Sequence, residues 1–278
     1  MITYDPKNWI RILLDFPRSP VFRTLALDVV GAGLWAALVV WVETDLIHVA
    51  VPLGPAFLSI LGIILGLLLV FRTNTAYDRW WEGRRLWGQL VNVSRGLARQ
   101  LATRLDSASD ATRRRRYSDL LSQFPEALAA HLRRPRGSDG PRPPHSLLDA
   151  LHAEVRADQS AGRLGPETGI ILAPLLQGLD DVLGGCERIR NTPIPFSYSS
   201  YIKQFVMLYA LVMPFGLVRE FGYGTVIASM FTFFATMGLE LLATEIEEPF
   251  GTDINDLPLD QLTAVIERDV ASILATAE

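Results

Sequence analysis

Apolar residues gather in four long runs along the chain, with one large polar region between the second run and the third. The runs cover residues 25–42, 56–71, 205–218 and 225–243. With their apolar flanks they approach the roughly 20 residues that a helix needs to cross a bilayer. The pattern therefore predicts an all-α membrane protein with four transmembrane helices per subunit.

The second run continues into polar sequence without a break. Residues 56–85 read AFLSILGIILGLLLVFRTNTAYDRWWEGRR, and no proline separates the apolar half from the charged half. Because proline is the residue that most strongly ends a helix, we expect one continuous helix here. This helix would leave the membrane near residues 73–75 and enter a basic, water-exposed body.

The polar region, residues 72–203, is rich in arginine directly after the second run. Cytosolic loops carry an excess of Lys and Arg, so this region and both termini are expected on the cytosolic side of the membrane. Apolar positions recur there at spacings of three and four, which predicts helices rather than strands. The expected helices cover residues 86–97, 120–132, 147–155, 170–189 and, in the tail, 259–275, with a loop at 135–145.

These boundaries divide the chain into five segments. They are an N-terminal cytosolic segment (1–24), spans 1 and 2 (25–71), a helical cytosolic region (72–203), spans 3 and 4 (204–244) and a C-terminal cytosolic tail (245–278). The N-terminus carries prolines and an acid before its first long apolar run, unlike a cleaved signal peptide. We therefore expect it to stay attached.

The composition agrees with a chain that is part embedded and part hydrated. The chain is 49% hydrophobic and 20% charged, with a formal net charge of −4, which lies between soluble proteins and polytopic membrane proteins. The single cysteine, Cys186, excludes an intramolecular disulfide and a cysteine-pair metal site. The arginine run at 113–116 has no aromatic residues between its members, so we expect a solvated helix face and no nucleic-acid partner.

Motifs of catalytic chemistry are missing from the sequence. It contains no HExxH, no GxSxG and no GxxxxGK, and no acid pair lies within a span where it could relay protons. We therefore do not expect an enzyme. A carrier with alternating access would show inverted repeats, and the two pairs of spans do not resemble each other. A membrane-anchored scaffold or signalling protein without conduction stays as the alternative to a channel.

The second span has two unlike faces. Gly62 and Gly66 form a GxxxG pair, which lets a neighbouring backbone approach closely. At about 100° per residue, Ile60 and Ile64 point away from Gly62, and Ala56 lies on their stripe. If the glycine face met neighbours in a ring of subunits, this stripe would line an apolar neck that gates by dewetting. Alternatively, these side chains meet lipid or another span.

Three stretches of the sequence closely resemble the bestrophin family, in particular its bacterial branch. They are FRTNTAYDRWWEGRRLWGQLVNVSR (71–95), TPIPFSY (192–198) and EEPFGTDINDLPLD (247–260), and they occur in the family's order. The resemblance implies a homopentamer of helical subunits around one axial pore in the bacterial inner membrane. It would passively conduct small monovalent ions, chloride or cations such as sodium, and would need no cofactor. Its partners would be its own copies, membrane lipid and the permeating ions.

The resemblance also implies roles for individual residues. Its neck positions fall on Ile60 and Ile64, with Ala56 one turn earlier, and its cytosolic aperture falls on Ile194. In animal relatives the acidic segment after the fourth span forms a calcium clasp. The matching positions here are Glu248, Asp253 and Asp256, although Ile254 and Asn255 dilute the acidic run. Calcium is therefore a possible ligand, beside the alternative of helix capping and a solvated turn.

Overall fold

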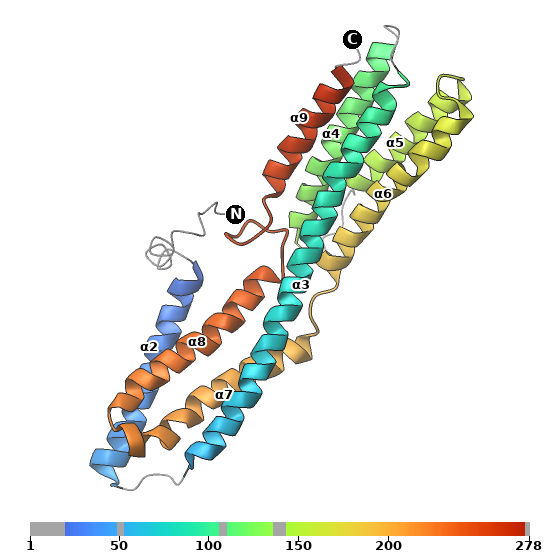
Figure 1. The fold of residues 1–278 in the computed structure, drawn as a ribbon. Coiled ribbons are helices and arrows are strands. Elements are labelled where there is room, and N and C mark those ends of the chain that lie inside the picture. The colour runs from blue at the N-terminus through green and yellow to red at the C-terminus, as the bar shows by residue number, and fades with distance from the viewer. Residues whose placement is uncertain (1–19, 49–52, 106–109, 136–142, 276–278) are drawn as a thin grey trace. The chain divides into compact units, whose positions relative to one another are not determined.

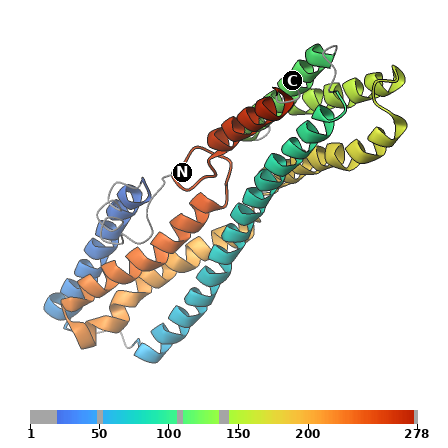
Figure 2. The same ribbon diagram turned by 45° about the horizontal axis from the view of Figure 1, so that its top comes forward.

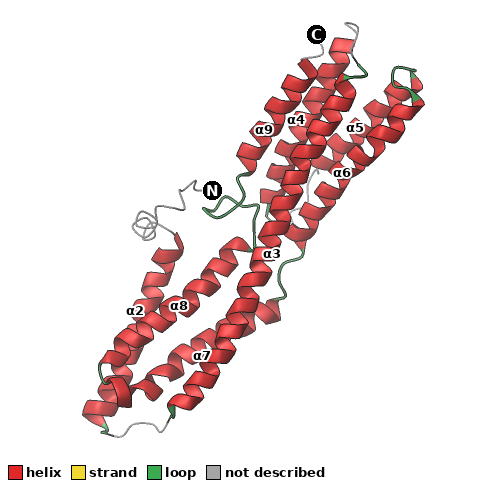
Figure 3. Ribbon diagram, viewed as in Figure 1, coloured by secondary structure: helices red, strands yellow, loops and turns green. Residues whose placement is uncertain are grey.

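The computed structural model describes residues 20–48, 53–105, 110–135 and 143–275 of the chain (Figure 1). Within these ranges the regular elements are helices, and no strand occurs (Figure 3). The predicted all-α class is therefore confirmed for the described part of the chain.

The helices follow the predicted runs closely and extend most of them. They are α2 (Pro20–Trp41), which continues into the π-helix η2 (Val42–Leu46), α3 (Pro55–Ala102), α4 (Ala111–Arg133), α5 (Pro143–Ser160), α6 (Pro166–Asn191), α7 (Phe196–Phe221), α8 (Gly224–Ile246) and α9 (Leu259–Ala275). The loop expected at 135–145 is wrong at its end, because α5 already begins at Pro143. Proline is well tolerated in the first turn of a helix, where its missing N–H is not needed. Residues 136–142 of that loop lie outside the described residues.

The continuous helix expected at 56–85 is confirmed. It forms part of α3, which is 48 residues long. At the change from apolar to polar sequence, the Thr73 hydroxyl donates to the carbonyl oxygen of Leu69 at 3.0 Å, and the Thr75 hydroxyl donates to that of Phe71 at 2.8 Å. These polar side chains bond to the helix that carries them, so the helix continues through them.

Two compact units make up the chain, and each is described by itself. The span unit consists of the described residues up to Asp78 together with Ile194–Glu247. The bundle unit consists of the described residues of Arg79–Pro193 and Glu248–Glu278. Helix α3 contributes its first part to the span unit and its second part to the bundle unit.

In the span unit, α2 packs against α8 and α7, and α7 packs against α8 (Figures 1 and 2). A buried cluster joins Leu65 and Leu69 of α3, Ile202 and Val206 of α7 and Phe233 of α8. The indole N–H of Trp35 on α2 also donates to the carbonyl oxygen of Leu211 on α7 at 3.0 Å. The first part of α3 thus joins this cluster through Leu65 and Leu69.

In the bundle unit, α4 packs against α9, α5 and α6, and α5 packs against α6. Trp87 and Leu90 of α3, Tyr117 and Phe124 of α4 and Val182 of α6 belong to one buried core. The segment between α8 and α9 packs on α3 as well. A Cβ atom at Gly83 would lie only 3.1 Å from the ring of Phe250, so glycine allows this close approach.

Among the described residues, five helices are long and apolar enough to cross a membrane. They include one helix more than predicted, α6. The apolar window of α6 is 44% buried, the largest share of the five. Leu172, Leu179 and Val182 of α6 are fully buried in the bundle core. The apolar composition of α6 is therefore explained by packing inside the protein.

Candidate functional site

The packed face of α3 in the span unit is narrow. Its buried side chains are those of Leu58, Leu65, Leu69, Arg72 and Ala76. With about 100° between successive residues, all five lie within about 40° of one line along the helix. The greater part of the helix circumference is therefore turned away from its own unit.

The three predicted neck residues lie on this outward side. Ile60 is 58% exposed and Ile64 is 41% exposed, and Ala56 is exposed as well. Ile60 and Ala56 point about 160° away from the packed line, and Ile64 about 120° away from it. The structure thus brings these side chains together on one apolar face of the chain.

A second apolar stripe lies on the same face and was not predicted from the sequence. Ile63, Leu67 and Phe71 are 65%, 56% and 61% exposed. They follow one another at intervals of four residues, as Ile60 and Ile64 do, and all point at least about 140° from the packed line. Leu67 and Phe71 point about 140° and 180° away from Gly62, but Ile63 points only about 100° away from it. The full stripe therefore becomes clear only from the buried positions that define the packed face.

The close approach expected at the glycine pair occurs within the chain. A Cβ atom at Gly62 would lie 3.1 Å from the hydroxyl of Tyr209 on α7, while a Cβ at Gly66 would meet nothing within 4 Å. Gly62 therefore lets α7 approach α3 in the same subunit. This contact fixes which side of α3 faces inward, and it leaves the Ile60 stripe outside.

Buried charges lie at the end of the apolar part of α3. The Arg72 Nε lies 3.2 Å from Glu240 Oε2 on α8, and Arg72 Nη1 lies 2.5 Å from Glu247. Arg72 Nη2 also donates to the Thr244 hydroxyl at 3.2 Å, and Lys203 Nζ lies 3.8 Å from Glu240. The side chains of Arg72 and Glu240 are both 0% exposed.

This cluster holds α3 in one rotation about its own axis. A buried ion pair that loses one partner leaves an uncompensated charge, which costs about 3–5 kcal/mol. Arg72 directly follows Phe71, whose side chain lies on the exposed face. Turning the exposed stripe inward would therefore pull Arg72 away from Glu240. The sequence contained a signal for this pair, because an acid inside an apolar run needs a partner.

Similarity to known proteins covers this whole arrangement. A family model described as bacterial/fungal bestrophin protein matches residues 1–139 and 136–272. The chain belongs to this bestrophin family. The matched residues include α3 with its apolar face and the three partners of Arg72, which are Glu240, Thr244 and Glu247. The resemblance noted in three stretches of sequence is therefore confirmed over nearly the full chain.

Curated relatives of this bestrophin match it over almost their entire lengths. A voltage-dependent anion channel-forming protein of Nostoc sp. is 35% identical, covering 97% of this chain and 92% of the relative. The voltage-dependent anion channel-forming protein YneE of Escherichia coli is 31% identical, covering 100% of this chain and 95% of the relative. A crystal structure of a bacterial bestrophin homologue from Klebsiella pneumoniae is 31% identical, with a TM-score of 0.79 over 90% of this chain and 98% of that one.

In this bestrophin, the predicted aperture residue Ile194 lies in the short connection between α6 and α7. Its side chain is only 9% exposed in the single chain. Just before it, Arg79 of α3 donates to the carbonyl oxygens of Ile189 at 2.7 Å and Thr192 at 2.6 Å. The end of α6 is thereby tied to α3.

The predicted calcium-clasp residues form a turn that is closed by its own hydrogen bonds. Glu248 and Asp253 are exposed, whereas Asp256 is 2% exposed. The Asp256 carboxylate accepts the backbone N–H of Asp253 at 2.6 Å, and the N–H of Leu257 donates to the carbonyl oxygen of Pro249 at 2.9 Å. Within the described ranges, no group of three or more His, Cys, Asp or Glu side chains is arranged to hold a metal ion.

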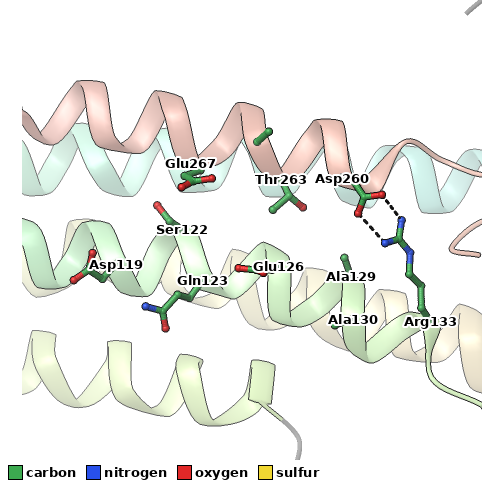
Figure 4. Close-up of a pocket in the computed structure, with 11 residues that line it drawn as sticks. Asp119, Ser122, Gln123, Glu126, Ala129, Ala130, Arg133, Asp260, Thr263 and Glu267 are labelled. Atoms are coloured by element: carbon green, nitrogen blue, oxygen red, sulfur yellow. Dashed lines mark hydrogen bonds and ion pairs between the residues drawn. The ribbon is translucent and has the colours of Figure 1, made fainter. Parts of the chain in front are cut away.

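A polar groove of about 570 Å³ runs between α4 and α9 of the bundle unit (Figure 4). Asp119, Glu126 and Glu267 line it, and all three are exposed. At one end, Arg133 donates to both carboxylate oxygens of Asp260, at 2.7 and 2.9 Å. These hydrogen bonds from Arg133 lower the pKa of Asp260. The groove is a polar surface, and the Arg133–Asp260 pair joins α4 to α9 at one end of it.

Proposed function

We propose that this bestrophin forms a homopentameric channel that passively conducts small anions such as chloride across the bacterial inner membrane. The observation that carries the proposal is the exposed apolar face of α3, opposite the side that packs into its own unit. Such a face suits a position on the axis of a ring of copies, where apolar side chains form a constriction. The relatives named as anion channel-forming proteins support the same function.

In this proposal the membrane is crossed by α2, the first part of α3, α7 and α8, and both termini are cytosolic. Helix α6 stays in the cytosolic bundle, since its apolar side chains already pack in the bundle core. The second part of α3 carries exposed arginines, among them Arg84, Arg85 and Arg99. Their position on the cytosolic side follows the positive-inside rule.

The proposed neck is formed by rings of Ile60 and Ile64, with Ala56 as a wider ring at its outer end. Apolar rings of this kind stop ions by excluding water when they are narrow. Ile194 is proposed as the cytosolic aperture. The positions Glu248, Asp253 and Asp256 are proposed to act as a capped turn that needs no cofactor, with calcium binding as the alternative.

Reconstitution into liposomes tests whether the protein conducts ions and whether those ions are anions or cations. Apolar rings do not choose between charges, so the anion preference has to be measured directly. Under a sodium chloride gradient, we expect the current to reverse close to the equilibrium potential of chloride. Reversal at the equilibrium potential of sodium would overturn the anion preference but keep the channel. An intact assembly without flux above empty vesicles would favour a scaffold without conduction.

A further inference from the structure

We infer that two charged residues on the exposed side of α3, Asp78 and Arg85, set the charge preference of the channel and act on it with opposite signs. The copies of Arg85 form a ring that favours anions, and the copies of Asp78 form a ring that favours cations. The inference rests on the proposed function, because it uses the position of α3 beside the axis of a ring of copies. It adds the residues that choose between ions, which the apolar neck does not do.

Asp78 lies on the same side of α3 as the proposed neck residues. It is the last residue of α3 in the span unit, and it is exposed. Measured from the packed line of that unit, Asp78 points about 160° away, which is the direction of Ile60. Asp78 is therefore the first charged residue that follows Phe71 on this side of the helix.

Arg85 lies on the exposed side of the second part of α3, and its direction is measured from the bundle unit by itself. The fully buried residues of this part of the helix include Trp87, Leu90, Ser94 and Leu101, each 0% exposed. They lie within about 40° of one line along the helix, and Arg85 points about 180° away from that line. The side chain of Arg85 is exposed. The bundle unit therefore leaves the Arg85 side of α3 open, as the span unit leaves the Ile60 side open.

The exposed side of α3 changes from apolar to polar after Phe71. Up to that residue, the side chains within about 40° of the direction opposite the buried residues are all apolar. Beyond it most of them are polar, and these are Asn74, Asp78, Arg85, Gln89, Asn92 and Arg99. Apolar rings gate by excluding water, whereas rings of charged side chains select ions by their sign. The two basic residues on this side outnumber the one acid, in keeping with the proposed preference for anions.

The charges of Asp78 and Arg85 are not used to hold the fold together. Other arginines of α3 are used in this way: Arg79 donates to carbonyl oxygens at the end of α6, and Arg95 pairs with Asp269 of α9. Among the residues that the structure describes, the side chains of Asp78 and Arg85 make no hydrogen bond or ion pair. Both charges therefore act on ions in the water beside the helix.

The two rings act separately in salt solution. Asp78 and Arg85 are seven residues apart, which is about 10 Å along the helix at 1.5 Å per residue. This distance is close to the Debye length of about 10 Å in roughly 0.1 M salt. Equal charges around one axis add their effects there, so a basic ring raises the local concentration of anions and an acidic ring raises that of cations.

The test is the reversal potential of the full-length protein in liposomes under a sodium chloride gradient. We expect Arg85→Gln to lower the ratio of chloride to sodium permeability roughly threefold or more, and Asp78→Asn to raise it by a similar factor. Both shifts should shrink as the salt concentration is raised, because screening shortens the reach of a charge. Arg84→Gln is the matched control. Arg84 is exposed and carries the same charge next to Arg85, but it points only about 80° from the buried line, so its removal should shift the ratio much less.

Flux with an unchanged reversal potential in Arg85→Gln and Asp78→Asn would overturn the inference and leave the proposed channel intact. Equal shifts by Arg84→Gln and Arg85→Gln would overturn it as well, because the direction of the side chain would then not matter. An intact wild-type assembly without flux would remove the proposed function and the inference together. If Arg85→Gln assembles poorly, Asp78→Asn decides alone, and the absence of a shift toward chloride in that variant overturns the inference.

Discussion

Single residues decide which side of α3 is exposed. Gly62 admits the Tyr209 hydroxyl on one side, and Arg72 is bound to Glu240 on nearly the same side. Both residues act on the orientation of the helix, although neither belongs to the exposed apolar face. At this scale the buried ion pair is the stronger constraint, because leaving one of its charges unpaired is costly.

We therefore predict that Arg72→Gln lowers stability and alters the orientation of α3. Of its ion-pair partners Arg72 and Lys203, Glu240 would then keep the more distant Lys203, at 3.8 Å. The expected loss is about 3–5 kcal/mol. The double variant Arg72→Met with Glu240→Leu should recover most of this loss, since it removes both charges at once. Thermal unfolding in detergent measures the effect. Equal destabilisation by the single and double variants would contradict the role of the pair.

The orientation of α3 is measured separately, by the labelling of introduced cysteines. Cys186 is the single cysteine of the chain and is fully buried. In a Cys186→Ala background, a cysteine introduced elsewhere is therefore the one thiol that a reagent can label. We expect a water-soluble thiol reagent to label Ile60→Cys faster than Gly62→Cys. In the presence of Arg72→Gln this difference should shrink. A pattern unchanged by Arg72→Gln would leave the pair a role in stability alone.

Sequence reasoning reached part of this residue-scale picture. The outward direction of Ile60 and Ile64 follows from helix geometry and was predicted. The stripe of Ile63, Leu67 and Phe71 was not predicted, because which apolar residues of a span are buried depends on the neighbouring helices. The partner of Gly62 was likewise hidden, since a small residue shows where something approaches but does not show from which chain.

At the scale of elements, helix periodicity carried most of the prediction. All expected helices are present, and the tail helix has the predicted bounds. This is because apolar residues that recur every three or four positions form the buried face of a helix. Hydropathy alone was less decisive for α6, which is apolar enough to span a membrane yet is buried in the bundle. The hydrogen bonds and ion pairs between helices could not be predicted, because they join residues that are distant in sequence.

One such interaction joins three helices of the bundle unit at Glu187. On α6, Glu187 Oε1 accepts from His131 of α4 at 2.8 Å and from His145 of α5 at 3.0 Å. Partial burial alone would raise the pKa of Glu187, but the hydrogen bonds from His145 and His131 outweigh it and lower this pKa. The Glu187 carboxylate thus joins α6 to both α4 and α5.

We predict that stability falls in acid through Glu187. A carboxylate with a lowered pKa contributes stability above its unfolded value, about 4.3 for glutamate, and loses it as the pH falls through the lower folded value. Glu187→Gln should therefore be less stable than wild type near neutral pH and should converge with it in acid. Unfolding midpoints across pH measure this. Glu126→Gln, at an exposed carboxylate of α4, should leave the profile unchanged.

The two apolar stripes of α3 allow a prediction about gating. Shortening side chains in a hydrophobic constriction admits water, so Ile60→Ala with Ile64→Ala should raise flux in liposomes. The triple change Ile63→Ala, Leu67→Ala and Phe71→Ala tests the neighbouring stripe. Leu27→Ala, on the exposed face of α2, is the control. A response to the second stripe alone would place the neck at Ile63, Leu67 and Phe71, and no response to either stripe would remove the neck from α3.

At the scale of the whole molecule, the proposed assembly follows from the face that α3 leaves uncovered. We predict a protein mass of five 30.9 kDa subunits by light scattering in detergent. Oxidation of Ile60→Cys in the Cys186→Ala background should then link neighbouring copies, because five equivalent residues would surround one axis. Leu27→Cys, 78% exposed on α2, should form far fewer links, since it faces lipid in this arrangement. A monomeric mass, or equal linking at both positions, would place the apolar face of α3 against lipid and leave no axial neck.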